Sequence, residues 1–247
     1  MNAILLAAGY GTRLHPLTKD RPKSLLPVAG RPIVDYLVDR LETAPEIERM
    51  VLVTNARFAG HFRDWAAERS FRVPLQVVND GTASNEDRLG AIADTQFAVA
   101  EAGIGGQAAY ILATDNLPKF DLRDIIALSK SRKASAVFTC RSTNPDDLRR
   151  WGVAEVDAQG RVLSFVEKPE EPKGDLRVPP FYVYTAEAMD LISAYLAEGN
   201  NPDAPGHYLG WVVQRAEVYA LRRDEGTYDI GTLETYRTVC QELGRKG

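Results

Sequence analysis

The feature that most constrains the fold is a short apolar run, Ala3 to Ala8, that ends in the glycine-bearing segment Gly9-Tyr-Gly-Thr-Arg-Leu14. The run predicts a buried strand, and the segment after it predicts a loop at the carboxyl end of that strand. Glycines let backbone N–H groups close on a ligand, so such a loop can wrap a series of phosphate oxygens. Arg13 and the later Lys23 add positive charge, which makes a triphosphate the natural ligand.

Two glycines after a strand also occur in α/β proteins that bind no phosphate, so this pattern alone is weak evidence. The loop is not a P-loop, which needs Gly-Lys-Ser or Gly-Lys-Thr at the start of a helix, and the dinucleotide-binding fingerprint lacks the downstream lysine. The specific part is the combination with Pro22-Lys23-Ser24-Leu25-Leu26-Pro27 and then Gly30-Arg-Pro-Ile33.

Length and composition indicate a globular protein. The chain has 247 residues, of which 45% are hydrophobic and 26% charged, with a net charge of -4. It can bury a core, and nothing in its charge balance indicates a nucleic-acid or membrane partner. The first apolar run is too short for a membrane span and has no basic flank before it, so we expect no signal peptide. Cys140 and Cys240 are far apart in the sequence, so we expect reduced thiols and not a disulfide, which favours a cytoplasmic location.

Apolar runs and helical patterns alternate along much of the chain. This alternation predicts an α/β fold with a Rossmann-like, doubly wound sheet in three α/β/α layers, and ligands bound outside the carboxyl ends of the strands. The predicted strands are 3–8, 50–55, 75–78, 108–114 and 134–139, and the predicted helices are 33–43, 58–69, 87–102 and 122–133.

From Trp151 the pattern changes to a hairpin, with strands at 152–156 and 161–166 around a turn at 157–160. Antiparallel strands therefore join the sheet, which makes it mixed. Residues 169–180, rich in proline and charge, predict a mobile loop. No repeat and no second compositional domain is visible, so we expect a single domain over 1–247. The remaining predicted elements are a strand at 181–184, helices at 186–197 and 207–215, a strand at 216–221 and a helix at 233–243.

The loop, the Pro22-Lys23 dipeptide and the Gly30-Arg-Pro-Ile segment together resemble the signature of the sugar-phosphate nucleotidylyltransferases, also called NDP-sugar pyrophosphorylases. The resemblance implies that Arg13 and Lys23 are catalytic. No hexapeptide repeat follows Gly231, so we expect a short form of this family without the C-terminal β-helix that some members carry. The residues implied to contact the nucleotide in this region are Leu6, Ala8, Gly9, Gly11 and Thr12.

Two aspartates are candidate ligands of Mg²⁺. Asp115 directly follows an apolar strand, where a carboxylate can hold the ion against triphosphate oxygens. The segment Tyr228-Asp-Ile-Gly-Thr-Leu-Glu234 is similar to the family's C-terminal Asp-x-Gly-Thr, which implies that Asp229 is the second ligand. On local grounds alone Asp115 could cap a turn and Asp229 could precede a helix capped by Thr232. The family usually has a glycine where this chain has Thr114.

The acceptor site is implied by Glu167-Lys168-Pro169, which matches the family's Glu-Lys-Pro, where the lysine meets the sugar phosphate. Lysine is a flexible point charge suited to that task. Trp151-Gly-Val-Ala-Glu155 is similar to the family's Tyr-Gly-Val segment, and Gly152 would let the substrate approach the backbone. The predicted acceptor-binding residues are therefore Gly152, Glu167 and Lys168, although a solvated strand end would also explain the charged pair.

The region expected to select the base departs from the family. Many members place a glutamine and then Pro-x-Gly-x-Ala after the third strand, whereas this chain has an amide- and hydroxyl-rich segment over 79–91. Asparagine amides both donate and accept, as a base edge requires. The loop also somewhat resembles that of cytidylyltransferases that act on phosphocholine, and this resemblance makes a pyrimidine plausible. An Asn-Asp-Gly turn before a capped helix would use the same residues. The predicted nucleotide-binding residues here are Asn79, Gly81, Thr82 and Asn85.

These expectations describe an enzyme that transfers a nucleotidyl group from an NTP to a phosphorylated small molecule, a sugar 1-phosphate, and releases pyrophosphate. Mg²⁺ is the expected cofactor. One alternative is a cytidylyltransferase for a phospho-alcohol such as phosphocholine, since the asparagine-bearing loop somewhat resembles that of such cytidylyltransferases. Another is a non-catalytic, nucleotide-sensing regulatory subunit, favoured only by Thr114 and the segment 79–88. The sequence leaves open the base, the sugar and whether the chain forms a homo-oligomer.

Overall fold

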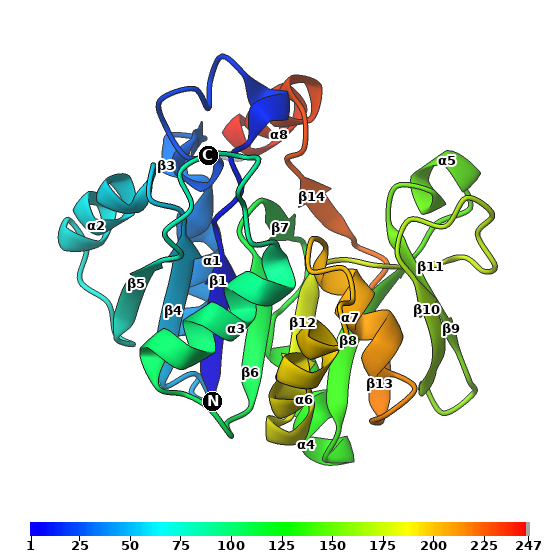
Figure 1. Ribbon diagram of the computed structural model, residues 1–247. Coiled ribbons are helices and arrows are strands. Elements are labelled where there is room, and N and C mark those ends of the chain that lie inside the picture. Colours follow the sequence, from blue (N-terminus) through cyan, green and yellow to red (C-terminus); the bar gives the residue numbers. More distant parts are fainter. Residues whose placement is uncertain (246–247) are drawn as a thin grey trace.

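A computed structural model describes residues 1–245, and a large mixed sheet lies at its centre (Figure 1). The strands of this sheet are β1 (Asn2–Leu6), β4 (Arg49–Thr54), β5 (Leu75–Asn79), β6 (Ala109–Ala113), β8 (Ser135–Arg141), β9 (Gly152–Val156), β10 (Val162–Val166), β11 (Leu176–Val178), β12 (Phe181–Tyr184) and β13 (Val218–Arg222). Their order is β10-β9-β11-β8-β12-β6-β1-β4-β5, and β13 pairs with β8.

Strand directions confirm a mixed sheet. β1 lies parallel to β4 and to β6, and β4 lies parallel to β5. β12 is antiparallel to both of its neighbours, β6 and β8. Because the carboxyl ends of β1, β4 and β6 meet at one edge, the loops after these strands gather there.

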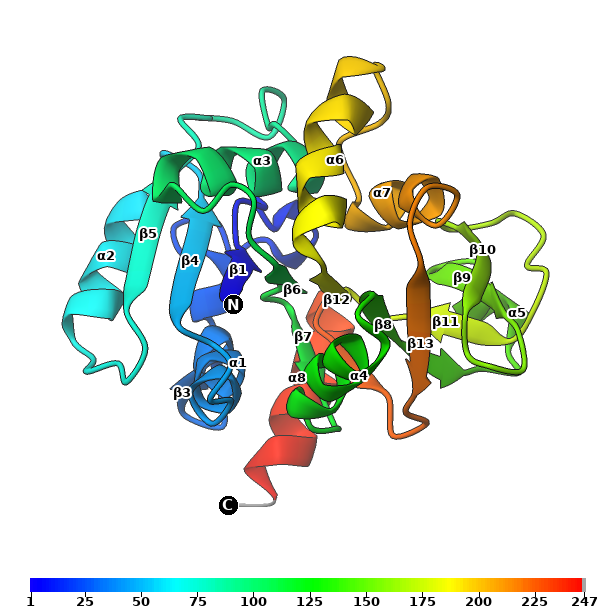
Figure 2. The same ribbon diagram turned by 90° about the horizontal axis from the view of Figure 1, so that it is seen from below.

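Helices cover both faces of the sheet, so the predicted three layers are confirmed (Figure 2). Side chains alternate along β1: Ala3 and Leu5 enter one core, and Ile4 enters the other. The first core contains α1 (Ile33–Glu42), α2 (Ala59–Ala67) and α4 (Arg123–Arg132). The second contains α3 (Ala91–Ala102), α6 (Ala186–Ala197) and α7 (Pro205–Val212).

A smaller core joins the two ends of the chain. Short strands missed in the sequence, β7 (Asn116–Pro118) and β14 (Thr227–Asp229), pair antiparallel, and α8 (Leu233–Gly244) follows. Tyr236 of α8 donates a hydrogen bond of 2.6 Å from its hydroxyl to the carbonyl oxygen of Pro27, in the hairpin β2 (Pro27–Val28) and β3 (Arg31–Pro32). The C-terminal segment therefore returns to the region of the first loop.

The helix predicted over 87–102 begins four positions later, at Ala91. Gly90 has φ 93°, and a Cβ there would lie 2.6 Å from the carbonyl oxygen of Pro202. The amides of Ala91 and Ile92 donate instead to the carbonyls of Asp203 and Pro202. The prediction was wrong at this end because a segment distant in sequence, not a local cap, sets where the helix starts.

The hairpin predicted after Trp151 is confirmed as β9 and β10. The predicted loop at 169–180 contains β11, which pairs with β8 and β9, so part of it belongs to the sheet. A short helix, α5 (Pro145–Leu148), precedes the hairpin. Cys140 and Cys240 are both free. Within residues 1–245 no helix combines the length and the apolar character needed to cross a membrane.

Candidate active site

A cavity of about 430 Å³ lies at the carboxyl edge of the sheet, between the loop after β1 and the start of α3. Its lining includes nine of the predicted site residues and several that were not predicted. The predicted ones are Leu6, Ala8, Gly9, Gly11, Thr12, Arg13, Lys23, Asn85 and Asp115. The others include Tyr10, Ser24, Arg88, Asp94, Thr114 and Asp203.

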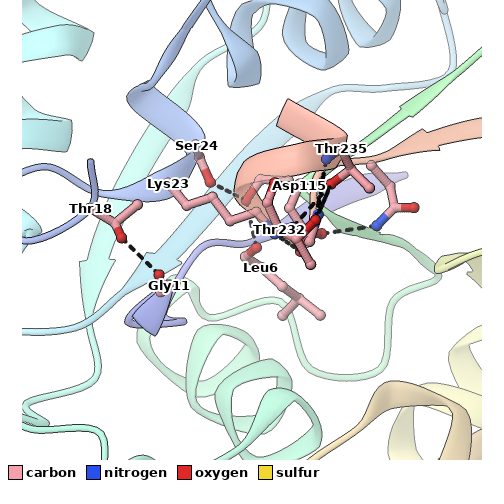
Figure 3. Close-up of polar contacts among 11 residues, drawn as sticks. Leu6, Gly11, Thr18, Lys23, Ser24, Asp115, Thr232 and Thr235 are labelled. Atoms are coloured by element: carbon pink, nitrogen blue, oxygen red, sulfur yellow. Dashed lines mark hydrogen bonds and ion pairs between the residues drawn. The ribbon is translucent and has the colours of Figure 1, made fainter. Parts of the chain in front are cut away.

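The first loop owes its shape to Gly11, which has φ 63° and begins a short 3₁₀ turn, η1 (Thr12–Leu14). A Cβ at Gly11 would lie 3.2 Å from Thr18 Cγ2, so even a small side chain would crowd its neighbour. Thr18 donates a hydrogen bond of 2.7 Å from its hydroxyl to the Gly11 carbonyl oxygen (Figure 3). The glycine therefore permits the turn that carries Arg13 to the cavity.

Lys23 and Asp115 meet inside the cavity, with Nζ 2.6 Å from Oδ2 (Figure 3). Lys23 belongs to the 3₁₀ turn η2 (Lys23–Leu25), and Asp115 follows β6. Asn116 donates from Nδ2 to the other oxygen of Asp115, Oδ1, at 3.0 Å. Burial would raise the pKa of Asp115, but the Lys23 ammonium and these hydrogen bonds outweigh it and hold the pKa below its usual value.

Asp229 lies beside this pair because β14 pairs with β7, which places Asp229 opposite Asn116. The amide of Ile230 donates to the Asp115 carbonyl oxygen at 3.0 Å. Burial and the nearby Asp115 carboxylate raise the pKa of Asp229, and Lys23 and Arg13 offset part of that rise. Two carboxylates from distant parts of the chain thus lie close enough to interact electrostatically.

These residues fit a magnesium ion that arrives with a nucleotide. Asn116 Oδ1 is buried and has no hydrogen-bond partner among residues 1–245, and the Asp115 and Asp229 carboxylates repel each other. Mg²⁺ commonly takes one or two carboxylates together with phosphate oxygens and waters. Over the described part of the chain, no cluster of three or more His, Cys, Asp or Glu side chains could hold a metal by itself. The donor set therefore suits a nucleotide-bound ion better than a closed protein site.

The predicted base-contacting residues separate into two groups. Asn85 lines the cavity, whereas Asn79, Gly81 and Thr82 are absent from its lining. Asn79 Oδ1 accepts a hydrogen bond of 3.0 Å from the Gly81 amide, which forms a local turn. The Thr82 hydroxyl lies 3.1 Å from the hydroxyl of Tyr10, a residue that does line the cavity. Nucleotide contact by these three residues stays a prediction.

Arg88, Asp94 and Asp203 form part of the cavity wall, and none of them was predicted from the sequence. Arg88 Nε lies 3.0 Å from Asp203 Oδ1, which links the segment before α3 to the segment before α7. Asp94 is buried in α3, and its Oδ1 has no hydrogen-bond partner in the part of the chain that the structure describes. Burial and the neighbouring Asp80 raise the pKa of Asp94 to about 8. A lone aspartate in the apolar stretch 91–99 was the only available signal, and nothing in the sequence indicated Asp203.

The predicted acceptor residues lie outside this cavity lining, at the end of the β9–β10 hairpin. Glu167 is mostly buried against the start of α7, where a Cβ on Gly206 would lie 2.0 Å from its Oε2. Burial raises the pKa of Glu167. Lys168 has an exposed side chain and φ 47°. The Phe165 ring occupies the space beside Gly152, where a Cβ would lie 2.0 Å from Cζ, so packing alone requires this glycine.

A doubly wound sheet with a basic glycine loop and paired aspartates at its carboxyl edge defines a nucleotide-binding α/β protein. The comparison with known families is more specific. The chain belongs to the nucleotidyl transferase family, whose profile matches residues 2–246.

Named relatives and solved structures agree with this family. The chain is 31% identical over 246 residues to a glucose-1-phosphate thymidylyltransferase of Actinoplanes sp., covering 94% of this chain and 75% of the relative. It is 31% identical over 251 residues to the UTP-glucose-1-phosphate uridylyltransferase AglF of Haloferax volcanii, covering 98% and 96%. A UDP-glucose pyrophosphorylase solved with UDP-glucose shares the fold with a TM-score of 0.82 at 22% identity, covering 100% of this chain and 99% of that chain.

Proposed function

We propose that this protein transfers a nucleotidyl group from a pyrimidine NTP to a sugar 1-phosphate, forming an NDP-sugar and releasing pyrophosphate. The observation that carries the proposal is the meeting of Lys23, Asp115 and Asp229 beside a basic glycine loop. The thymidylyl and uridylyl relatives, which are both named for glucose 1-phosphate, support the choice of acceptor and of base class.

In the proposed reaction an oxygen of the acceptor phosphate attacks the α-phosphorus of the NTP. A new P–O bond forms there, and the bond to the β-phosphate oxygen breaks in line, so that pyrophosphate leaves. Both reactants are anions, so the protein contributes alignment and charge neutralisation, not a covalent intermediate. Arg13 and the loop amides hold the leaving pyrophosphate, Lys23 the α-phosphate region, and Lys168 the acceptor phosphate.

Asp115 and Asp229 would hold Mg²⁺, which supplies charge neutralisation on the triphosphate. The Lys23 ammonium pairs with the Asp115 carboxylate in the structure. In the reaction it would leave this carboxylate and contact a phosphate oxygen. Glu167 and Gly152 border the acceptor, and Asn85 contacts the base. We propose that residues 1–247 form one catalytic domain that acts in the cytoplasm, where the free thiols of Cys140 and Cys240 would stay reduced.

The test is pyrophosphate release over a panel of UTP, dTTP, CTP, ATP and GTP, each with glucose 1-phosphate, other sugar 1-phosphates or phosphocholine. We expect turnover with UTP or dTTP and a sugar 1-phosphate. Turnover only with CTP and phosphocholine would support the phospho-alcohol alternative. Nucleotide binding without turnover on any pair would support a regulatory subunit, and would contradict the proposal.

A further inference from the structure

A second contact lies directly beside the Lys23–Asp115 ion pair. Ser24 Oγ is 2.5 Å from Thr114 Oγ1, and Thr114 Oγ1 is 2.8 Å from the Leu6 carbonyl oxygen. The neighbouring dipeptides Lys23-Ser24 and Thr114-Asp115 therefore contact each other at two points, one ionic and one neutral. Figure 3 shows Lys23, Ser24, Asp115 and Leu6 gathered at this place.

The direction of the hydrogen bonds follows from the chemistry of the groups. The Leu6 carbonyl can only accept, so the single hydroxyl proton of Thr114 goes to it. Ser24 must then donate its own proton to Thr114 Oγ1. Both residues border the cavity but are themselves buried, with Thr114 2% and Ser24 4% exposed.

The three residues connect elements that have to keep a fixed relation at the cavity. Leu6 ends β1, Thr114 follows β6, and Ser24 lies in η2 next to Lys23. The Thr114 amide also donates to the Leu6 carbonyl oxygen at 3.2 Å, which continues the pairing of β1 with β6. We call the two hydrogen bonds from Ser24 to Thr114 and from Thr114 to Leu6 the hydroxyl relay. The relay connects the η2 turn, and with it the backbone of Lys23, to the carboxyl ends of two central strands.

We propose that Thr114 and Ser24 are positioning residues for Lys23, a role that rests on the proposed function. When a nucleotide draws the Lys23 ammonium away from Asp115, the ion pair is lost, but the neutral relay remains and keeps η2 in place. A displacement of about 1 Å of an aligned group can cost about 10²-fold in rate. The relay needs a hydroxyl at position 114, since a side chain without one could neither donate to the Leu6 carbonyl nor accept from Ser24.

The relay can be tested by substitutions that remove or keep its hydroxyls. Thr114→Val keeps the side-chain shape without the hydroxyl, Thr114→Ser keeps the hydroxyl, and Ser24→Ala removes the donor from the other side. The matched control is Ser129→Ala, which removes a buried hydroxyl that donates to the Ala134 carbonyl oxygen at 2.7 Å, in the region of α4.

The first readout needs no activity. Lys23 is only 11% exposed, so brief acylation followed by mass spectrometry should label it weakly compared with Lys168, which is 62% exposed. We expect Thr114→Val and Ser24→Ala each to raise Lys23 labelling at least about fivefold at unchanged Lys168 labelling. Thr114→Ser and Ser129→Ala should leave it at the wild-type level. Unchanged Lys23 labelling in both folded relay variants would overturn the proposal.

The second readout is turnover on the best substrate pair. We expect kcat to fall about 10- to 100-fold in Thr114→Val and in Ser24→Ala, with KM changed by less than about threefold. Because the two hydroxyls act as one unit, the double variant should be no worse than either single variant. Additive losses, or a loss in Ser129→Ala of the same size, would also overturn it. An inactive wild type with the expected labelling would contradict the proposed function and leave the positioning of Lys23 supported.

Discussion

The Lys23 ammonium lies 2.6 Å from the Asp115 carboxylate, although 92 positions separate the two residues in the sequence. The proposed reaction needs the Lys23 ammonium at a phosphate and the Asp115 carboxylate at a metal ion. In the structure these two charges balance each other. In the proposed reaction, substrate binding would replace this ion pair with a contact of Lys23 to phosphate and of Asp115 to the metal ion.

Removal of either partner should stop the reaction without unfolding the protein. We expect Lys23→Ala and Asp115→Ala each to lower kcat about 10²- to 10³-fold, because each removes a charge aligned with the transition state. Pyrophosphate release gives the rates, and circular dichroism checks folding. Lys130→Ala, which breaks an exposed ion pair with Glu46, is the control and should retain full turnover. Near-normal turnover in either site variant would contradict the assignment.

Turnover should require a divalent metal held by the two aspartates. A chelator should abolish pyrophosphate release, and added Mg²⁺ should restore it. Asp229→Asn should raise the Mg²⁺ concentration for half-maximal rate at least about tenfold, since one charged ligand is lost. Asp224→Asn, at an exposed carboxylate paired with Arg222, should not shift the requirement. Full activity in chelator would disprove the metal requirement.

Lys168 should act on the acceptor and not on the nucleotide. Loss of a charge-assisted hydrogen bond costs about 1.5–3 kcal/mol, so Lys168→Met should raise KM for the sugar 1-phosphate about 10- to 100-fold. Methionine and lysine are both unbranched at Cβ and are alike in tolerating φ 47°, so the substitution adds no new backbone strain. KM for the NTP should stay within about threefold. Lys173→Met, on the following segment, serves as the control. Equal effects on both substrates would show that Lys168 acts elsewhere.

The two asparagines predicted from the sequence should differ in effect. Asn85 lines the cavity and Asn79 does not, so Asn85→Ala should lower kcat/KM for the preferred NTP about tenfold, the cost of a lost hydrogen bond. It should also reduce the discrimination among UTP, dTTP and CTP. Asn79→Ala should affect stability more than base preference, because its amide oxygen holds a local turn. A change of base preference in Asn79→Ala alone would reverse these roles.

Asp94 should make the fold less stable as the pH rises. Its pKa is raised to about 8 in the folded protein, whereas an unfolded aspartate titrates near about 3.9. Between these values the folded state retains a proton that the unfolded state has lost, so this contribution to stability is full below about pH 4 and is lost as the pH approaches 8. Asp94→Asn should remove that slope. Chemical unfolding at intervals from pH 5 to 9 would measure it, and parallel curves for the two proteins would contradict the prediction.

Much of the fold follows from local pattern, because strand and helix periods depend on neighbouring side chains. The apolar run before Gly9 had to be a buried strand, and the hairpin after Trp151 is confirmed almost to the residue. The short strands β7 and β14 were missed, since three residues carry no period of their own. The start of α3 was misplaced because Pro202 and Asp203 cap it from a distant segment.

By itself, the sequence determined the class of sheet, the glycine-bearing loop after its first strand and the residue types that the proposed site needs. Only the tertiary structure decided that Asp229 lies against Asn116 and Asp115, that Asp203 closes the wall beside Arg88, and that Ser24 donates to Thr114. These contacts join segments about 90 to 115 positions apart, as in the 90 positions between Ser24 and Thr114 and the 115 between Arg88 and Asp203. The order of strands in the sheet, which no local pattern encodes, is what brings such segments together.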